Sequence, residues 1–276
     1  MELREFAERV LFATSLEEKL RTPDVMTDEC PGAAVVTPTA PGRPRDLHFK
    51  PTGTARGEFP GARQLEQNQE RGRLLHFFAN HELLATELMA LVLLKFPEAP
   101  AAFRKGVYET LKDEQEHTRL YIERMRGCGI EFGAIPVSGY FWRAVAGMES
   151  PMDYIAGLSL TFEQANLDFC RQFARAFASV GDEATAHLLD KICRDEIGHV
   201  AYGLKWNADD NIVSSREEFP SNRLPWQSLA PLGVELRQAD TAAAEDPEEA
   251  LFSLVDQKTR LLTVSSVQFA SGLRMD

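Results

Sequence analysis

In the middle of the chain, apolar residues recur at helical spacing and predict four long helices. Pro97 ends the first of them and Gly127 follows the second, because proline and glycine terminate helices. Ser150 and Asp182 are good N-terminal caps for the third and the fourth. The predicted helices cover residues 62–96, 100–126, 150–179 and 181–206.

The lengths of the connections predict how these helices pair. A few residues join the first helix to the second and the third to the fourth, so each pair is expected to form an antiparallel hairpin. Residues 130–149, rich in aromatic residues, glycine and proline, are long enough to cross the length of a bundle. Two hairpins with one long crossover have the ferritin-like topology. We therefore predict an all-α fold, a ferritin-like four-helix bundle with an N-terminal arm and a C-terminal extension.

The chain follows other patterns before and after the bundle. Residues 3–21 predict a short amphipathic helix, and seven prolines within residues 22–62 exclude a regular helix and predict an extended arm packed on the bundle. In the tail, Asp246 followed by Pro247 predicts a helix start, with no function attached. The predicted domains are residues 1–61, 62–206 and 207–276, the last partly helical.

A spacing of glutamate and histidine occurs twice within the predicted bundle. In each half a single glutamate is followed, 32 or 33 positions later, by a Glu-x-x-His pair. This pair spacing places both side chains on one face of a helix. One such pair can arise by chance, but the doubled spacing and the shared Asp-Glu-x-x-His core are much harder to obtain by accident. The six residues are Glu82, Glu114 and His117 in the first half and Glu163, Glu196 and His199 in the second.

These six residues predict a metal centre. Four carboxylates and two imidazoles inside a bundle are the ligand set of a two-metal carboxylate site. Mixed oxygen and nitrogen ligation favours iron or manganese, and the four cysteines lack the Cys-x-x-Cys spacing of a zinc site. The expected cofactors are two iron ions, or an Fe/Mn or Mn/Mn pair. Two ions about 3.5–4 Å apart can act on one small molecule between them, and dioxygen is the expected co-substrate.

Other polar residues lie at helical spacing from the predicted ligands. Asp113 and Asp195 directly precede ligand glutamates and could each accept the free ring N–H of the histidine in the other hairpin, with a surface position as the alternative. Further side chains could line a substrate pocket or take part in radical or proton transfer, although each taken singly is more often core filler. These catalytic candidates are Tyr121, Asn166, Cys170 and Tyr202, with Cys193 beside them.

Glu87 competes with Glu82 for the place of the first ligand. The two residues are about 140° apart around a helix, so only one of them is expected to face the core. Glu82 shares its face with an apolar stripe and is preferred, whereas Glu87 is expected to be exposed or in a salt bridge. His76 and His81 lack the pair spacing and are expected to be satisfied histidines outside the centre.

The composition and the net charge limit which binding partners and which cellular compartment are expected for this protein. The net charge of −12 and the pI near 5.1 argue against DNA, RNA or an anionic membrane as the main partner. The first residues are too charged for a signal peptide, and no apolar run reaches transmembrane length. The four cysteines have the character of reduced thiols. A soluble cytoplasmic protein is expected, with a homodimer left open.

Several segments resemble a known family. Residues 75–83 (Leu-His-Phe-Phe-Ala-Asn-His-Glu-Leu), 163–168 (Glu-Gln-Ala-Asn-Leu-Asp) and 195–203 (from Asp-Glu-Ile-Gly-His onward) are similar to the pattern of domain-of-unknown-function family four-five-five, in the ferritin-like superfamily. Residues 82–85 (Glu-Leu-Leu-Ala) and 113–124 also resemble the ferroxidase helices of bacterioferritin. The family resemblance covers about residues 62–206 and, more loosely, the arm before them. It implies a ferritin-like fold and a di-metal site with the same six ligands, including Glu82 and excluding Glu87, and it implies no substrate.

The expected function is a di-metal oxidase or oxygenase that activates dioxygen on a small-molecule or peptide substrate and takes electrons from an external donor. The aromatic crossover and the segments flanking the bundle, which could cover a pocket, favour this function. Three alternatives remain. A ferroxidase, iron-storage or peroxide-scavenging protein is disfavoured as a cage by those flanking segments. A binding or scaffold protein could keep a structural metal site. A tRNA hydroxylase is disfavoured by the acidic charge unless basic residues concentrate on one face.

Overall fold

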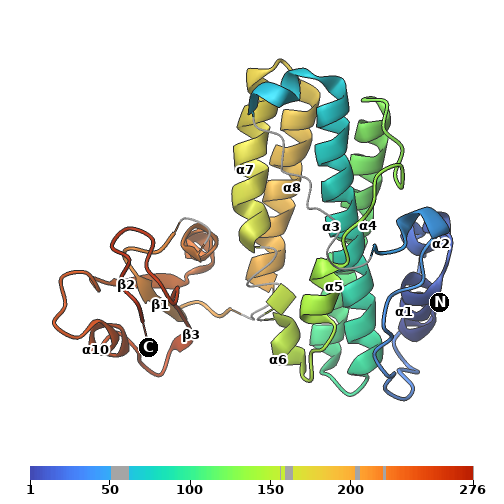
Figure 1. The fold of residues 1–276 in the computed structure, drawn as a ribbon. Helices are drawn as coiled ribbons and strands as arrows, with labels where there is room; N and C mark the ends of the chain where they lie inside the picture. Colours follow the sequence, from blue (N-terminus) through green and yellow to red (C-terminus); the bar gives the residue numbers. More distant parts are fainter. Residues whose placement is uncertain (51–61, 156, 159–163, 203–205, 220–221, 276) are drawn as a thin grey trace. The chain divides into compact units, whose positions relative to one another are not determined.

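The computed structural model describes residues 1–50, 62–155, 157–158, 164–202, 206–219 and 222–275. The chain is mostly helical and carries a small parallel sheet of three strands towards its C-terminus (Figure 1). The prediction of a mainly helical fold is therefore confirmed. The all-α class is wrong for the C-terminal part, where the sheet lies.

Two short helices begin the chain, α1 (Leu3–Phe12) and α2 (Leu16–Leu20). One helix was predicted over residues 3–21, but the chain turns between them because the Ser15 side chain accepts the N–H of Glu18 and caps α2. The apolar face of α1 is buried, and this helix packs against α3.

An extended stretch follows α2 and lies on the helices. Its backbone from residue 22 to residue 50 is irregular, apart from an isolated parallel β-bridge between Thr27 and Glu2 and a 3-10 turn at Arg45–Leu47. The carboxylate of Asp28 accepts two hydrogen bonds from Arg104 at 2.7 Å each. Residues 51–61 of the predicted arm lie outside the described residues.

The first long hairpin consists of α3 (Asn68–Lys95) and α4 (Ala101–Arg126), which lie side by side and are joined by a short turn (Figure 1). A 3-10 turn at Ala62–Glu66 precedes α3. The run from Glu82 to Leu94 in α3 is buried without interruption. By length and composition α3 could cross a membrane, yet 89% of its apolar window is buried inside the protein, as in the core helix of a soluble protein.

The second pair of long helices is α7 (Gln164–Ser179) and α8 (Glu183–Tyr202). The predicted cap of α8 is confirmed, because Asp182 accepts the backbone N–H of Thr185 at 3.1 Å. Arg124 of α4 donates to the same carboxylate at 2.6 Å, which ties the start of α8 to the end of α4.

Two short helices lie between the hairpins, α5 (Tyr140–Val145) and α6 (Pro151–Tyr154). The helix α5 was not predicted, and it packs against α3. Ser150 caps α6 through a capping box, as its sequence indicates. The continuity of the predicted third helix between α6 and α7 depends on residues 159–163, which lie outside the described residues.

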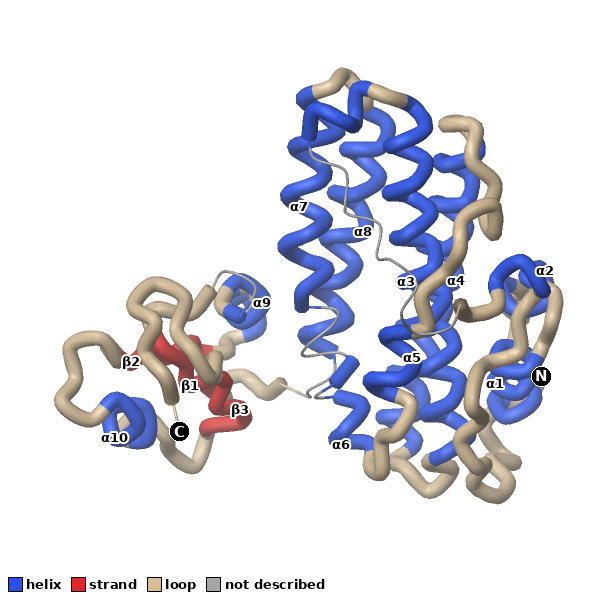
Figure 2. The backbone as a smooth tube through the Cα atoms, viewed as in Figure 1, coloured by secondary structure: helices blue, strands red, loops and turns tan. Residues whose placement is uncertain are grey.

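The C-terminal part contains the parallel sheet, drawn in red in Figure 2. Its strands are β1 (Asn211–Ser215), β2 (Glu235–Ala239) and β3 (Thr259–Thr263), in the order β2-β1-β3. Every residue of β1 is buried. Only Ile212 and Val213 of its five residues are apolar, so β1 has neither the alternation nor the apolar run that identifies a strand from sequence. This explains why the sequence pattern missed the sheet.

Short helices accompany these strands. They are α9 (Leu224–Gln227) and α10 (Pro247–Phe252). The predicted start of α10 is confirmed, since the Asp246 side chain accepts the N–H groups of Glu248 and Glu249.

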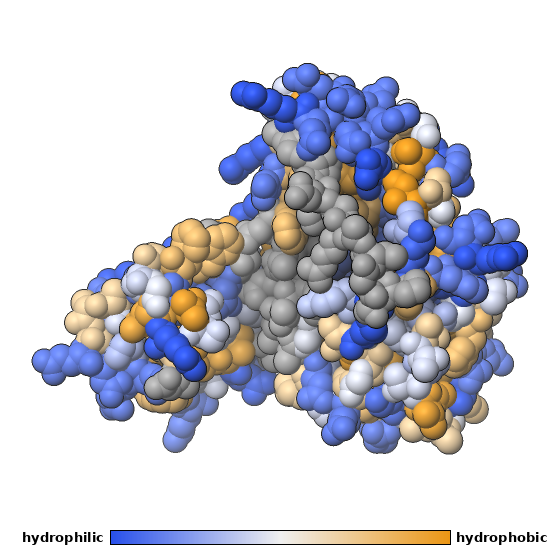
Figure 3. All heavy atoms as spheres, in the orientation of Figure 1, coloured by the Kyte–Doolittle hydropathy of each residue, from blue (hydrophilic) through white to orange (hydrophobic). Residues whose placement is uncertain are grey.

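Apolar side chains remain on the surface of the C-terminal part (Figure 3). Its core cluster is small and contains the buried residues Val213, Ala239, Leu251 and Met275. A parallel sheet ordinarily has both faces covered by other elements. The exposed large apolar residues of this part are Phe219, Leu232, Phe252, Val255, Val267 and Phe269.

His76 on α3 contacts the segment that follows α4, at Phe132 and Gly133. Its side chain is buried, and Nε2 accepts the backbone N–H of Gly133 at 3.0 Å. The ring also packs edge-on against Phe132. Burial lowers the pKa of His76 from 6.5 to about 4, so the ring is neutral at neutral pH, as an accepting Nε2 requires.

Replacement of His76 by glutamine is expected to reduce the decrease in the free energy of unfolding between pH 6.5 and about pH 4. The folded pKa lies below the unfolded one, so the contribution of His76 is present above pH 6.5 and is lost as the pH falls towards about 4. The loss amounts to about 2–3 kcal/mol over this window. Glutamine keeps an acceptor for Gly133 and does not titrate. Urea unfolding of the metal-free protein across this pH range measures the difference, and parallel pH profiles for wild type and variant would contradict it.

Candidate metal centre

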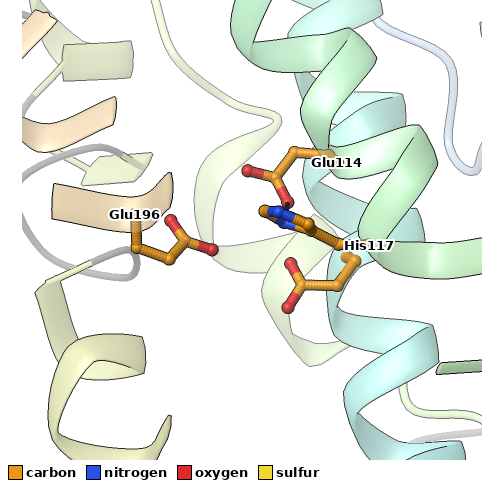
Figure 4. A group of neighbouring side chains, drawn as sticks. Glu114, His117 and Glu196 are labelled. Atoms are coloured by element: carbon orange, nitrogen blue, oxygen red, sulfur yellow. Dashed lines mark hydrogen bonds and ion pairs between the residues drawn. The ribbon is translucent and has the colours of Figure 1, made fainter. Parts of the chain in front are cut away.

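Four of the six predicted ligands lie together in the structure. Glu82, Glu114, His117 and Glu196 each offer one ligand atom, and these atoms all lie within 4.8 Å of one another. Their exposed fractions are 3% or less. Figure 4 shows Glu196 facing Glu114 and His117 from the opposite helix. The ligand atoms therefore come from α3, α4 and α8.

The local pattern on α4 places two of these groups. Glu114 and His117 are three residues apart on one face of the helix, and Nδ1 of His117 lies 3.2 Å from Oε2 of Glu114. The neighbouring Thr118 hydroxyl donates to the Glu114 carbonyl at 2.8 Å, and on α3 the Thr86 hydroxyl donates to the Glu82 carbonyl at 2.9 Å. Both hydroxyls are thus satisfied on their own helices beside the cluster.

The chemistry of the cluster suits a cation. Three carboxylates gathered in a buried place repel one another, and burial itself disfavours their charged forms. A divalent cation offsets both effects, and carboxylate oxygens with an imidazole nitrogen are ligands that first-row metals accept. The cluster could therefore hold a metal ion.

The other two predicted ligands cannot be placed in the same way. Glu163 lies outside the described residues, and so does the side chain of His199. Their part in the centre remains a prediction.

Glu87 has a different role from Glu82, although both are buried. Its Oε1 lies 3.0 Å from Nζ of Lys19, and its Oε2 lies 2.6 Å from Nη2 of Arg43. Of the two alternatives expected for Glu87, exposure or a salt bridge, the structure shows the salt bridge, and the residue is buried. Only one of the two glutamates was expected to face the core, but the N-terminal segment covers the second face of α3.

Lys19 and Arg43 were not singled out from the sequence. Their exposed fractions are 0% and 2%, which is unusual for cations unless they are paired. Lys19 stands in the predicted amphipathic segment at residues 3–21, next to the apolar Leu20. A lysine beside an apolar stripe is a weak signal, because lysine commonly extends its charge into water from such a place.

His81 lies next to Glu82 in sequence and outside the ligand group. Its ring stacks on Phe141 of α5, with centroids 4.7 Å apart and planes 8° apart. The ring centroid of Phe77, on the same helix, lies 6.3 Å from that of His81. Burial lowers the pKa of His81 to about 4, against a smaller raising effect of Glu114. This histidine therefore packs among aromatic rings and is not part of the ligand group.

Two of the four catalytic candidates have described side chains, and both are buried. Tyr121 is 1% exposed and packs against Phe78, with ring centroids 5.5 Å apart. Cys170 on α7 is 5% exposed. The side chains of Asn166 and Tyr202 lie outside the described residues. A role in chemistry remains a prediction for all four.

The two aspartates that precede the ligand glutamates differ in exposure. Asp113 is exposed, and Asp195 is partly buried. The histidine that Asp113 would orient is His199, whose side chain is outside the described residues. Orientation of the histidines by these aspartates remains a prediction.

Comparison with known families finds a match that covers the helical part and strand β1. The model of the family described as "Protein of unknown function (DUF455)" matches residues 4–219. The chain belongs to this family. The DUF455 match includes α1 and the extended stretch as well as the long helices, so the segment around Lys19 and Arg43 belongs to the matched region.

A second family model matches the C-terminal part. Aminotransferase class-V covers residues 194–276 of this DUF455 chain. A probable cysteine desulfurase of Methanothermobacter thermautotrophicus is 37% identical over 84 residues, which are 30% of this chain and 21% of that protein.

Another relative is an uncharacterized protein of Haemophilus influenzae. It is 29% identical over 106 residues, which are 38% of this chain and 37% of that protein. The match to this DUF455 chain thus spans well under half the length of both relatives. No solved structure matches significantly.

Proposed function

We propose that this DUF455 chain is a ferritin-like di-metal oxidase or oxygenase that uses dioxygen to oxidise a small-molecule or peptide substrate. The observation that supports this proposal most is the buried group of Glu82, Glu114, His117 and Glu196, whose ligand atoms lie within 4.8 Å of one another. An external electron donor and a cytoplasmic location belong to the same proposal, and the four free cysteines agree with a reducing compartment.

The proposal treats α3, α4, α7 and α8 as a four-helix bundle. Contacts between the two hairpins support it. The ring of Phe78 on α3 lies 5.5 Å from that of Phe173 on α7, and Lys191 of α8 pairs with Glu116 of α4 at 3.1 Å. Facing helices that each contribute carboxylates are the usual way to build a two-metal site in such a bundle.

In this proposal Glu163 and His199 complete the ligand set, and two iron or manganese ions are held. When bound, the metals supply the reductive activation of dioxygen that side chains cannot provide. The chain's own groups do the rest. The buried surroundings of the carboxylates exclude water, and Nδ1 of His117 faces Glu114 and is held by it. The phenol of Tyr121, buried one helical turn beyond His117, is the candidate for moving a proton or an electron.

Oxygen consumption tests the proposal directly. Protein loaded with Fe(II) without air and then given oxygen and a reductant is expected to consume oxygen over repeated turnovers. The Glu114→Ala/Glu196→Ala variant should fall to the background rate, because it lacks two ligand carboxylates. Glu123→Ala is the control, since Glu123 is exposed on the same helix. Loaded wild type that consumes no oxygen would sink the enzyme proposal, and uptake of many ions per chain would favour iron storage.

The likeness to class-V aminotransferases does not extend the proposal to pyridoxal phosphate. That cofactor forms a Schiff base with a lysine. Among the described residues of the C-terminal part the lysine is Lys258, whose side chain is 60% exposed and lies 3.5 Å from Asp209. An exposed, ion-paired lysine does not fit a desolvated Schiff-base site, so we base no such chemistry on Lys258; Lys205, also in the matched region, lies outside the described residues.

A further inference from the structure

Lys19 joins the two helices that carry three of the metal-site residues. Its Nζ lies 3.0 Å from Oε1 of Glu87 on α3. Its backbone carbonyl accepts a hydrogen bond from Nε2 of Gln115 on α4, at 2.5 Å. One residue of the N-terminal segment therefore contacts both helices of the first hairpin through polar atoms.

Both contacts lie close in sequence to metal-site residues. Glu87 comes five positions after Glu82, and Gln115 directly follows Glu114. Gln115 is fully buried, and its Oε1 accepts a second hydrogen bond from the N-terminal segment, from the hydroxyl of Thr22 at 3.0 Å. The backs of the ligand-bearing turns of α3 and α4 are thus attached to the same short stretch of chain.

The side chain of Lys19 is held in one position. It donates to the Val10 carbonyl at 2.6 Å and to the Leu11 carbonyl at 3.3 Å, besides its contact with Glu87. An ammonium group has three N–H donors, so these contacts use all of them. Both carbonyls belong to the end of α1, so the ammonium also fixes where α1 lies on α3.

We infer that Lys19 is a positioning residue for the metal centre, and that docking of the N-terminal segment and metal binding stabilise each other. The inference rests on the proposed function. Metal ligands must be held close to their productive geometry, and the bridge through Lys19 restricts how α3 and α4 can move apart. Coupling of this kind is reciprocal, so metal binding must also tighten the N-terminal segment.

Two variants break the bridge at its two ends. Lys19→Met removes the ammonium, keeps most of the side-chain volume and leaves Glu87 paired with Arg43. Gln115→Leu removes the contact on α4. Asp28→Asn is the control, because it weakens another attachment of the same segment, to Arg104. Arg104 lies ten residues before Glu114, about 15 Å along the helix.

Mn(II) affinity, measured by competition with a chelator, tests the inference without any assay of activity. Lys19→Met and Gln115→Leu are each expected to weaken Mn(II) binding about fivefold or more. The double variant should lose about as much as either single variant, because both substitutions break the same bridge. Asp28→Asn should stay within about twofold of wild type. Hydrogen exchange of the α1 and α2 amides should slow on addition of Mn(II) in wild type, and less in Lys19→Met.

The outcomes separate this inference from the proposed function. Wild type that binds no Mn(II) overturns the proposed metal centre and the inference with it. Wild type that binds Mn(II), with both single variants binding equally well, overturns the inference alone. Independent losses that add in the double variant also overturn it, since they exclude a shared bridge.

Discussion

Addition of Fe(II) or Mn(II) is expected to raise the melting temperature of the wild-type protein, and replacement of Glu114 and Glu196 by alanine is expected to abolish this rise. A ligand that binds only the native state stabilises it, by about 4 kcal/mol at a thousandfold excess over Kd. For a domain of the size of the helical part this corresponds to roughly 10 °C. The two substitutions remove two of the three carboxylates in the described cluster, so the site loses both charge and ligand atoms.

Elemental analysis of the same proteins gives the second readout. About two metal ions per chain are expected in the wild type if all six predicted ligands take part, and none in the double variant. Glu123→Ala serves again as control and should keep both the metal and the rise in melting temperature. A double variant that still bound stoichiometric metal would show that other residues hold it. If the metal-free and the metal-loaded wild type melt at the same temperature, the metal at this cluster has no structural role either.

Helix starts were predictable because their chemistry is local. Ser150, Asp182 and Asp246 each cap the helix that follows them through a contact two or three residues away. The Glu114/His117 pair is local in the same sense, since three residues on a helix place both groups on one face. The approach of Glu196 to this pair depends on tertiary packing, and the doubled spacing of glutamate and histidine was the signal that indicated it.

The environment of Glu87 could not be predicted, because its partners are distant in sequence. Arg43 lies 44 positions before it, and Lys19 lies earlier still. No local pattern shows which segment covers the second face of α3. The angle between Glu82 and Glu87 around α3 shows that the two side chains point in different directions. Whether both are buried depends on the course of the N-terminal segment.

The sheet was missed for a related reason. Its central strand β1 is only five residues long and buried throughout, so it lacks the alternation that identifies a strand. Its neighbours β2 and β3 follow later in the chain with helices between them. The one helix predicted in this tail, α10, was found because Asp246 and Pro247 form a local start signal.

Replacement of Glu87 by glutamine is expected to destabilise the metal-free protein by roughly 3–5 kcal/mol, which is the range for breaking a buried ion pair at one partner. Glu87 is 0% exposed and contacts two buried cations, Lys19 and Arg43. Arg43 also donates to Oδ1 of Asn80 at 2.9 Å, so it cannot turn into water without breaking further contacts. Glutamine keeps the shape of the side chain and leaves both cations buried without a carboxylate between them.

Two further variants separate the contribution of the Glu87 charge to stability from that of side-chain packing. Lys19→Met leaves the Arg43–Glu87 pair intact and should cost the protein much less than Glu87→Gln. Adding Lys19→Met to Glu87→Gln removes one of the two uncompensated cations, so the double variant should be more stable than Glu87→Gln alone. Urea unfolding at neutral pH, with an unchanged m-value, measures each difference. If Glu87→Gln unfolds at the wild-type midpoint, the buried charge of Glu87 contributes nothing to stability. If the double variant is less stable than Glu87→Gln alone, packing of the Lys19 stem outweighs the relief of charge.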